Sequence, residues 1–167
     1  LDDGTLTTAD RAVLAHHLGR PEIRRIAEVD VGDCPRGGCW ERLLTLLDLR
    51  RDAYVIQLDS DTVTLGPVPE LERAIADRRD FTLLGGVDAR WLPVSAYAED
   101  LAALGPHAHV QAKAEAAMAQ LAAQVPGVTH YLRGCAGFAG FAPGGSGRAI
   151  ADDFSRAARA LLGDAVW

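Results

Sequence analysis

The chain has very little lysine, few aromatic residues and only three cysteines. Lys113 is the single lysine among 17 basic residues, and aromatic residues make up 6% of the 167 positions. With 23 acidic residues the formal net charge is −6, which argues against a nucleic-acid-binding protein because such proteins present a basic face. Scarce lysine beside abundant alanine, arginine and glycine indicates a GC-rich bacterial genome.

The number of cysteines and the length of the apolar runs indicate in which cellular compartment the protein is expected. Cys34, Cys39 and Cys135 make no even disulfide set, which favours a reducing cytoplasm. Cys34 and Cys39 have the spacing of half a zinc site, but no second Cys/His pair with finger-like spacing follows, so we do not expect zinc. No apolar run reaches the roughly 18 residues of a membrane helix, and no signal peptide is visible. We expect a cytoplasmic protein without a transmembrane segment.

Both ends of the chain have the character of cuts through an ordered domain. The chain starts at Leu1 without a methionine and ends on the apolar tripeptide 165–167. Its length corresponds to one domain. We therefore expect residues 1–167 to form a single, partial domain.

Strand-like and helical segments alternate along the sequence. This alternation predicts an α/β fold, a three-layer sandwich with a mostly parallel sheet, in which the 54–58 strand is central. Within the long helical region the clearest part runs from Gln111 to Gln124, after a break at Gly105 and Pro106. The predicted strands are 23–31, 54–58, 81–84, 129–132 and 134–142, and the predicted helices are 7–18, 40–51, 67–76, 93–125 and 148–162.

The most informative segment is the apolar run 54–58, which ends in Asp59, Ser60 and Asp61. Ligands of open α/β sheets bind at the carboxyl ends of the strands. Two ionised carboxylates held close repel each other unless a cation lies between them, and magnesium often takes one or two carboxylates plus substrate phosphates. The pattern predicts a metal-dependent site for a phosphorylated ligand.

The segment from Tyr54 to Leu71 resembles the D-x-D region of GT-A-fold glycosyltransferases. The resemblance covers roughly residues 20–145, and the D-x-D is its only sharp part. It implies a nucleotide-diphosphate sugar donor whose diphosphate is bridged by Mn²⁺ or Mg²⁺ to Asp59 and Asp61, with Ser60 between them. The acceptor stays unidentified, and so does any catalytic base.

A glycine-rich strand after the D-x-D lines the sugar and acceptor pocket in the same family. Arg133, Gly134 and Gly137 occupy that place here, although the family's usual Asn or Asp is absent. The resemblance implies that these three residues contact the donor, with Arg133 suited to pair with a phosphate. An ordinary surface salt bridge for Arg133 and a tightly packed strand for the glycines are the alternatives.

Other polar and aromatic candidates carry weaker signals. Asp88 and Trp91 follow a strand end and have the chemistry to bind and stack on a sugar, but a loop salt bridge and a partly buried indole explain them as well. His107 and His109 have the i, i+2 spacing that chelates a metal on a strand, yet their Gly-Pro entry indicates a loop.

Two other functions remain open. The segment 58–63 also fits the opening motif of a haloacid-dehalogenase-type phosphatase, with Asp59 as nucleophile, Asp61 as acid/base and magnesium as cofactor. Against it, some fifty structured residues precede the motif, and its possible later residues, Lys113 and Asp152–Asp153, lie inside predicted helices. The non-enzyme alternative is an inactive, truncated glycosyltransferase fragment.

Overall fold

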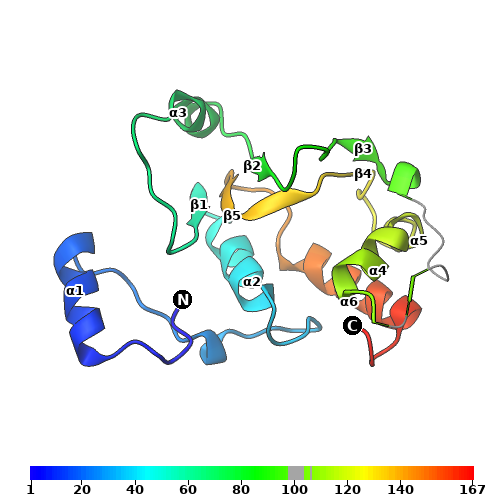
Figure 1. The fold of residues 1–167 in the computed structure, drawn as a ribbon, viewed down its shortest axis with the longest axis horizontal. Helices are drawn as coiled ribbons and strands as arrows, with labels where there is room; N and C mark the ends of the chain where they lie inside the picture. The colour runs from blue at the N-terminus through cyan, green and yellow to red at the C-terminus, as the bar shows by residue number, and fades with distance from the viewer. Residues whose placement is uncertain (98–103, 106) are drawn as a thin grey trace.

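The structure is a computed structural model that describes residues 1–97, 104–105 and 107–167. Figure 1 shows a central sheet with α2 against it, α3 and α1 lying apart from the rest, and a helical group at the C-terminal side. In chain order the elements are α1 (Thr8–Leu18), the 3₁₀ helix η1 (Ile26–Glu28), α2 (Trp40–Leu49), β1 (Val55–Leu58), α3 (Pro69–Ala76), β2 (Phe81–Leu84), β3 (Leu92–Pro93), the 3₁₀ helix η2 (Val94–Tyr97), α4 (Val110–Ala116), α5 (Met118–Ala122), β4 (His130–Tyr131), β5 (Gly134–Phe141) and α6 (Arg148–Leu162).

The sheets are antiparallel, so the expected three-layer sandwich with a mostly parallel sheet is wrong. The larger sheet has the order β1-β5-β2, and β5 runs antiparallel to both neighbours; β3 and β4 form a second antiparallel pair. β1 and β2 therefore run in the same direction, but β5 separates them. The 54–58 strand, expected at the centre, lies at an edge of its sheet.

Glycines in β5 leave room for side chains of β2. A Cβ on Gly140 would come within 2.1 Å of Phe81 Cε1, and one on Gly134 within 2.6 Å of Thr82 Oγ1. Side chains of β2 thus lie over positions where β5 has none. The hydrogen-bonded partners come from distant parts of the chain, and no local pattern in the sequence reports such a pairing.

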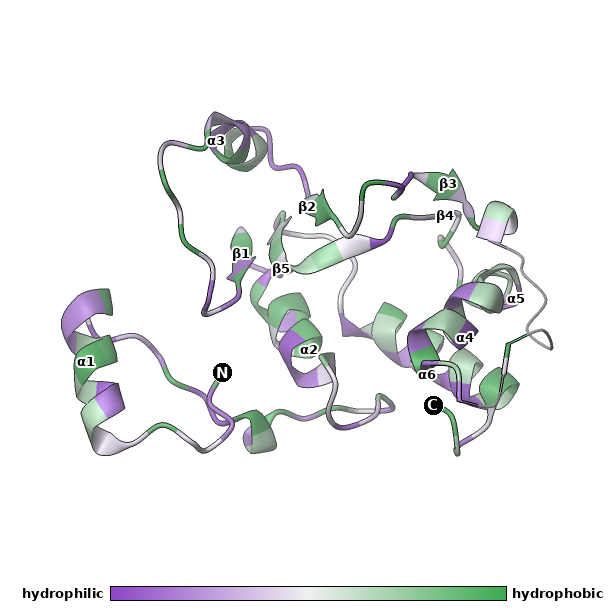
Figure 2. Cartoon of the chain, viewed as in Figure 1, coloured by the Kyte–Doolittle hydropathy of each residue, from purple (hydrophilic) through white to green (hydrophobic). Residues whose placement is uncertain are grey.

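The strands are less buried than their composition indicates. Ile56 and Leu58 are 37% and 54% exposed, whereas Gln57 between them is 9% exposed. Figure 2 shows β2 and much of β1 in the hydrophobic colour although both carry exposed residues. The buried-strand interpretation of 54–58 is corrected accordingly: the polar residue of β1, Gln57, is the one that faces inward.

Local signals placed most helices correctly. α1 has a capping box between Thr7 and Asp10 and ends at Gly19 in the left-handed conformation, as predicted for 7–18. Pro69 stands in the first turn of α3. The predicted strand 23–31 is wrong: it is irregular apart from η1 and one isolated bridge between Asp2 and Arg25.

The predicted continuous helix from Gln111 to Gln124 is interrupted. Ala117 ends α4 and precedes α5, with φ −87° and ψ 1°. The part of the predicted helix 93–125 that falls on residues 98–103 and 106 lies outside the described residues. Ala117 is fully buried in the cluster with α6, and helical hydrogen bonds still run through it: its N–H donates to the Lys113 carbonyl and its carbonyl accepts from the Leu121 N–H, both at 3.0 Å.

Two small buried clusters stabilise the described structure. The first joins α4, α5 and α6 and comprises Ala114, Ala117, Leu121, Val125, Ala157 and Ala158. The second joins α2 to the start of α6 and comprises Cys34, Leu44, Leu47 and Ala151. The second cluster holds α2 against α6, and α2 also contacts β1 of the sheet.

None of the helices in the described part of the chain has both the length and the apolar character that a bilayer-spanning segment requires.

Candidate functional site

The D-x-D segment forms a turn at the carboxyl end of β1. The backbone N–H of Asp59 donates to the carbonyl of Gly137 at 2.9 Å, which extends the β1–β5 ladder by one residue. The N–H of Thr62 then donates to the carbonyl of Asp59 at 3.0 Å and closes a tight turn over Ser60 and Asp61. The position of both aspartates is thus set by backbone hydrogen bonds.

Arg42 on α2 neutralises Asp59. Its Nη1 lies 2.5 Å from Asp59 Oδ1, and both side chains are about one-third exposed, at 33% and 38%. Its Nη2 also contacts Cys39 Sγ at 3.3 Å. The sequence offers no sign of this pair, because 17 residues separate Arg42 from Asp59 and only the packing of α2 on the sheet brings them together.

Asp61 and Ser60 are exposed to solvent at the turn. Within the described ranges, no group of three or more His, Cys, Asp and Glu side chains has the arrangement to hold a metal ion. Asp59 and Asp61 therefore offer at most two protein carboxylates. That number fits Mg²⁺ or Mn²⁺ held jointly with phosphate oxygens, which is how magnesium is commonly bound in proteins.

Gly137 lies directly against Asp59. A Cβ at Gly137 would stand 3.1 Å from Asp59 Oδ2 and 3.5 Å from Cys135 Sγ. The absence of a side chain at this position thus leaves room for the carboxylate and the thiol. Gly137 was predicted as a site residue, and the structure brings it to the D-x-D turn.

The remaining predicted residues are more scattered. Gly134, at the start of β5, lines a pocket of about 670 Å³ that Arg42, the partner of Asp59, also lines, but that residues 59–61 do not. Arg133 lines a different hollow, of about 490 Å³, and its Nε lies 3.5 Å from the Glu115 carboxylate. The surface salt bridge left open for Arg133 in the sequence is therefore present, and Arg133 does not share the pocket of Gly134.

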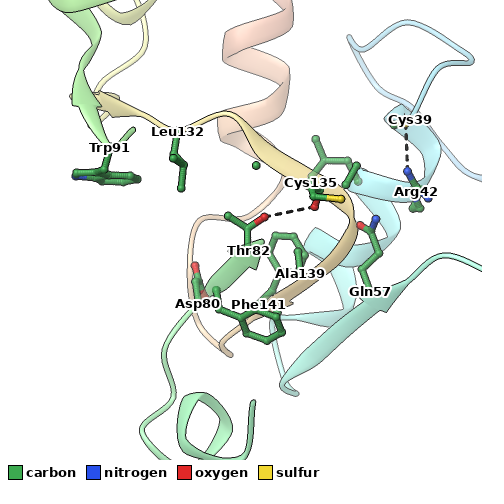
Figure 3. Close-up of a pocket in the computed structure, with 15 residues that line it drawn as sticks. Cys39, Arg42, Gln57, Asp80, Thr82, Trp91, Leu132, Cys135, Ala139 and Phe141 are labelled. Atoms are coloured by element: carbon green, nitrogen blue, oxygen red, sulfur yellow. Dashed lines mark hydrogen bonds between the residues drawn. The ribbon is translucent and has the colours of Figure 1, made fainter. Parts of the chain in front are cut away.

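The 670 Å³ pocket lies between α2 and the β1–β5–β2 sheet. Figure 3 shows Cys39 and Arg42 at one end and Trp91 with Leu132 at the other, with Gln57 extending from β1 toward Arg42. Gln57 was missed in the sequence. It stands two residues before Asp59, so strand alternation puts both side chains on one face, and this spacing was the available signal.

Asp88 and Trp91 line different hollows. Asp88 belongs to the smaller hollow with Arg133, and Trp91 to the larger pocket. Trp91 stacks on His130, with ring centroids 5.5 Å apart and planes within 4°.

His109 caps α4 by accepting a hydrogen bond from the Gln111 N–H at 3.2 Å, so its ring has a structural role.

The two aspartates that could serve as a later phosphatase motif make structural interactions on α6. Asp152 accepts a hydrogen bond from the Asp33 N–H at 3.2 Å, and Asp153 is paired with Arg156. Both lie on α6, and Lys113 lies on α4.

The cysteines Cys34, Cys39 and Cys135 are free thiols, and burial raises the pKa of Cys34.

No protein-family model, curated protein or solved structure matches the chain in the three comparisons made.

Proposed function

We propose that the chain binds the diphosphate of a nucleotide-sugar donor through a divalent cation held by Asp59 and Asp61, as part of a cytoplasmic enzyme that transfers the sugar to an acceptor. The observation that supports this best is the turn itself. Asp59 is fixed by Gly137 and Arg42, Asp61 is exposed two residues later, and Arg42 also lines the pocket of about 670 Å³. The free cysteines support the compartment.

The chemistry of this turn suits a diphosphate. Two carboxylates supply oxygen ligands to Mn²⁺ or Mg²⁺, and the phosphates supply further ones. The bound cation offsets the negative charge that develops on the departing diphosphate. Arg42 adds a second positive group at the same place, and its planar guanidinium suits phosphate oxygens.

Calorimetric titration of nucleotide sugars tests the proposal. UDP-glucose and GDP-mannose are titrated into the protein with MnCl₂ and, separately, with EDTA. We expect binding that requires manganese and weakens at least about tenfold in Asp61→Asn, since each charged contact contributes about 1.5–3 kcal/mol. Asp52→Asn is the matched control, because Asp52 is also exposed, at 76%, and pairs only with neighbouring Arg51 in the described structure. Equal affinity in Asp61→Asn and wild type would remove the metal site.

A phosphatase assay separates the main rival. Magnesium-dependent hydrolysis of 4-nitrophenyl phosphate that disappears in Asp59→Asn would replace the proposal with the haloacid-dehalogenase type. We expect no such hydrolysis, because Asp152 and Asp153 are engaged within α6 and with the loop at Asp33. Absence of both donor binding and hydrolysis would favour the inactive fragment.

A further inference from the structure

The pocket between α2 and the sheet has the size of a small-molecule site. Its volume of about 670 Å³ falls within the range of about 300–1,000 Å³ typical of ligand pockets. Leu43 contributes an apolar wall from α2 and Phe141 one from β5, and Trp91 and Leu132 lie at the far end (Figure 3). These walls favour a ligand with a mainly apolar body.

One polar group in this pocket is buried and unsatisfied. The Gln57 side chain lines the pocket, the residue is only 9% exposed, and its Nε2 has no hydrogen-bond partner among the described residues. A buried N–H donor without a partner costs about 1–3 kcal/mol, so such groups are rare and call for an explanation. A ligand oxygen that accepts from Nε2 would supply the missing partner.

The charged groups of the pocket are already compensated. Arg42 at one end is paired with Asp59. Asp80 accepts two hydrogen bonds from Arg50 Nη2, at 3.0 and 3.1 Å. The hydroxyl of Thr82 lies within hydrogen-bond distance of two backbone carbonyls. The unmet demand is therefore that of a neutral N–H donor, which matches an uncharged ligand oxygen.

We propose that this pocket binds an uncharged alcohol with an apolar body, whose oxygen accepts a hydrogen bond from Gln57 Nε2. If the transferase proposal holds, on which this step rests, the alcohol is the sugar acceptor. Gln57 and Asp59 lie on one face of β1 and are about 7 Å apart along the strand. The alcohol oxygen is thereby held close to the turn proposed to bind the diphosphate.

An NMR titration with two matched probes tests the pocket without metal or nucleotide sugar. Benzyl alcohol carries the oxygen, and toluene has nearly the same shape without it. In ¹⁵N-labelled wild type we expect both to shift the amides of Gln57, Cys135 and Ala139, and benzyl alcohol to bind roughly five- to tenfold more tightly, as one hydrogen bond allows. In Gln57→Leu the preference should fall to about one.

Two further variants complete the test. Gln124→Leu makes the same substitution at an exposed glutamine outside this pocket and should keep the preference for benzyl alcohol. Ala136→Leu fills the pocket from an exposed wall position and should weaken both probes, which keeps the test decisive if Gln57→Leu does not fold. An unchanged preference in Gln57→Leu, unweakened binding in Ala136→Leu, or no binding of either probe to wild type would overturn the alcohol site.

The two proposals fail separately. Probe binding in a protein that does not bind nucleotide sugars would keep the alcohol site and overturn its role as the acceptor site. Metal-dependent donor binding without probe binding would overturn the alcohol site alone.

Discussion

The guanidinium of Arg42 lies against the carboxylate of Asp59, with Nη1 2.5 Å from Oδ1, and this contact joins α2 to the end of β1. It reduces the negative charge at a turn where a second carboxylate, that of Asp61, follows two residues later. The same arginine forms one end of the pocket that contains Gln57. The proposed donor site and the proposed alcohol site therefore share a wall.

Gly137→Ala should impair the cation site. The new Cβ would lie 3.1 Å from Asp59 Oδ2, which is closer than most such contacts, so the carboxylate must move. We expect manganese-dependent nucleotide-sugar affinity to fall by about three- to tenfold, the cost of weakening one charged contact. Gly66→Ala is the control, because a Cβ there meets nothing within 4 Å. Titration calorimetry gives the comparison, and equal affinities in the two variants would contradict the role of Gly137.

Arg50→Met should destabilise the protein by about 1–3 kcal/mol, since it leaves the buried Ala142 carbonyl without its side-chain donor. Arg50 is 9% exposed by its side chain, donates from Nε to the Ala142 carbonyl at 3.0 Å, and pairs with Asp80. Arg51→Met is the matched neighbour: Arg51 is 80% exposed and pairs only with Asp52 in the described structure, so we expect a change below about 0.5 kcal/mol. Urea unfolding measures the free energy of unfolding of both variants, and similar losses of stability in the two would contradict this prediction.

Thr7→Ala should unfold α1 without reducing the stability of the rest. The Thr7 side chain accepts from the Asp10 N–H, and loss of such a cap costs about 1 kcal/mol. Since α1 contributes no buried residue, little tertiary packing opposes its unfolding. Amide hydrogen exchange should accelerate in residues 8–18 while protection in β5 stays unchanged. Faster exchange in β5 would show that α1 stabilises the sheet.

Tyr131 should titrate at high pH. Burial, followed by the hydrogen bond and charge of Glu115, raises its pKa from 10.0 to about 12. The neutral phenol is thus favoured in the folded state, so its contribution to stability is complete below pH 10 and disappears as the pH rises through about 12. The difference in phenolate absorbance between wild type and Tyr131→Phe measures this. Ionisation near pH 10 in the folded protein would contradict the burial.

Local structure was largely predictable from the sequence. Thr7, Asp10 and Gly19 mark both ends of α1, and the predicted helices 40–51 and 148–162 correspond to α2 and α6. These features depend on residues a few positions apart, because helix caps and the apolar face of a helix are short-range effects. The turn at Asp59 and Asp61 was predictable for the same reason: carboxylates follow a strand directly.

Only the tertiary structure decided which segments are neighbours. The position of β5 between β1 and β2, the pairing of Arg42 with Asp59, and the separation of Arg133 from Gly134 all depend on contacts across the fold. The exposed Leu58 and the inward Gln57 also reversed what their hydropathy suggests. Strand order and burial follow from the packing of distant segments, which local residue patterns do not encode.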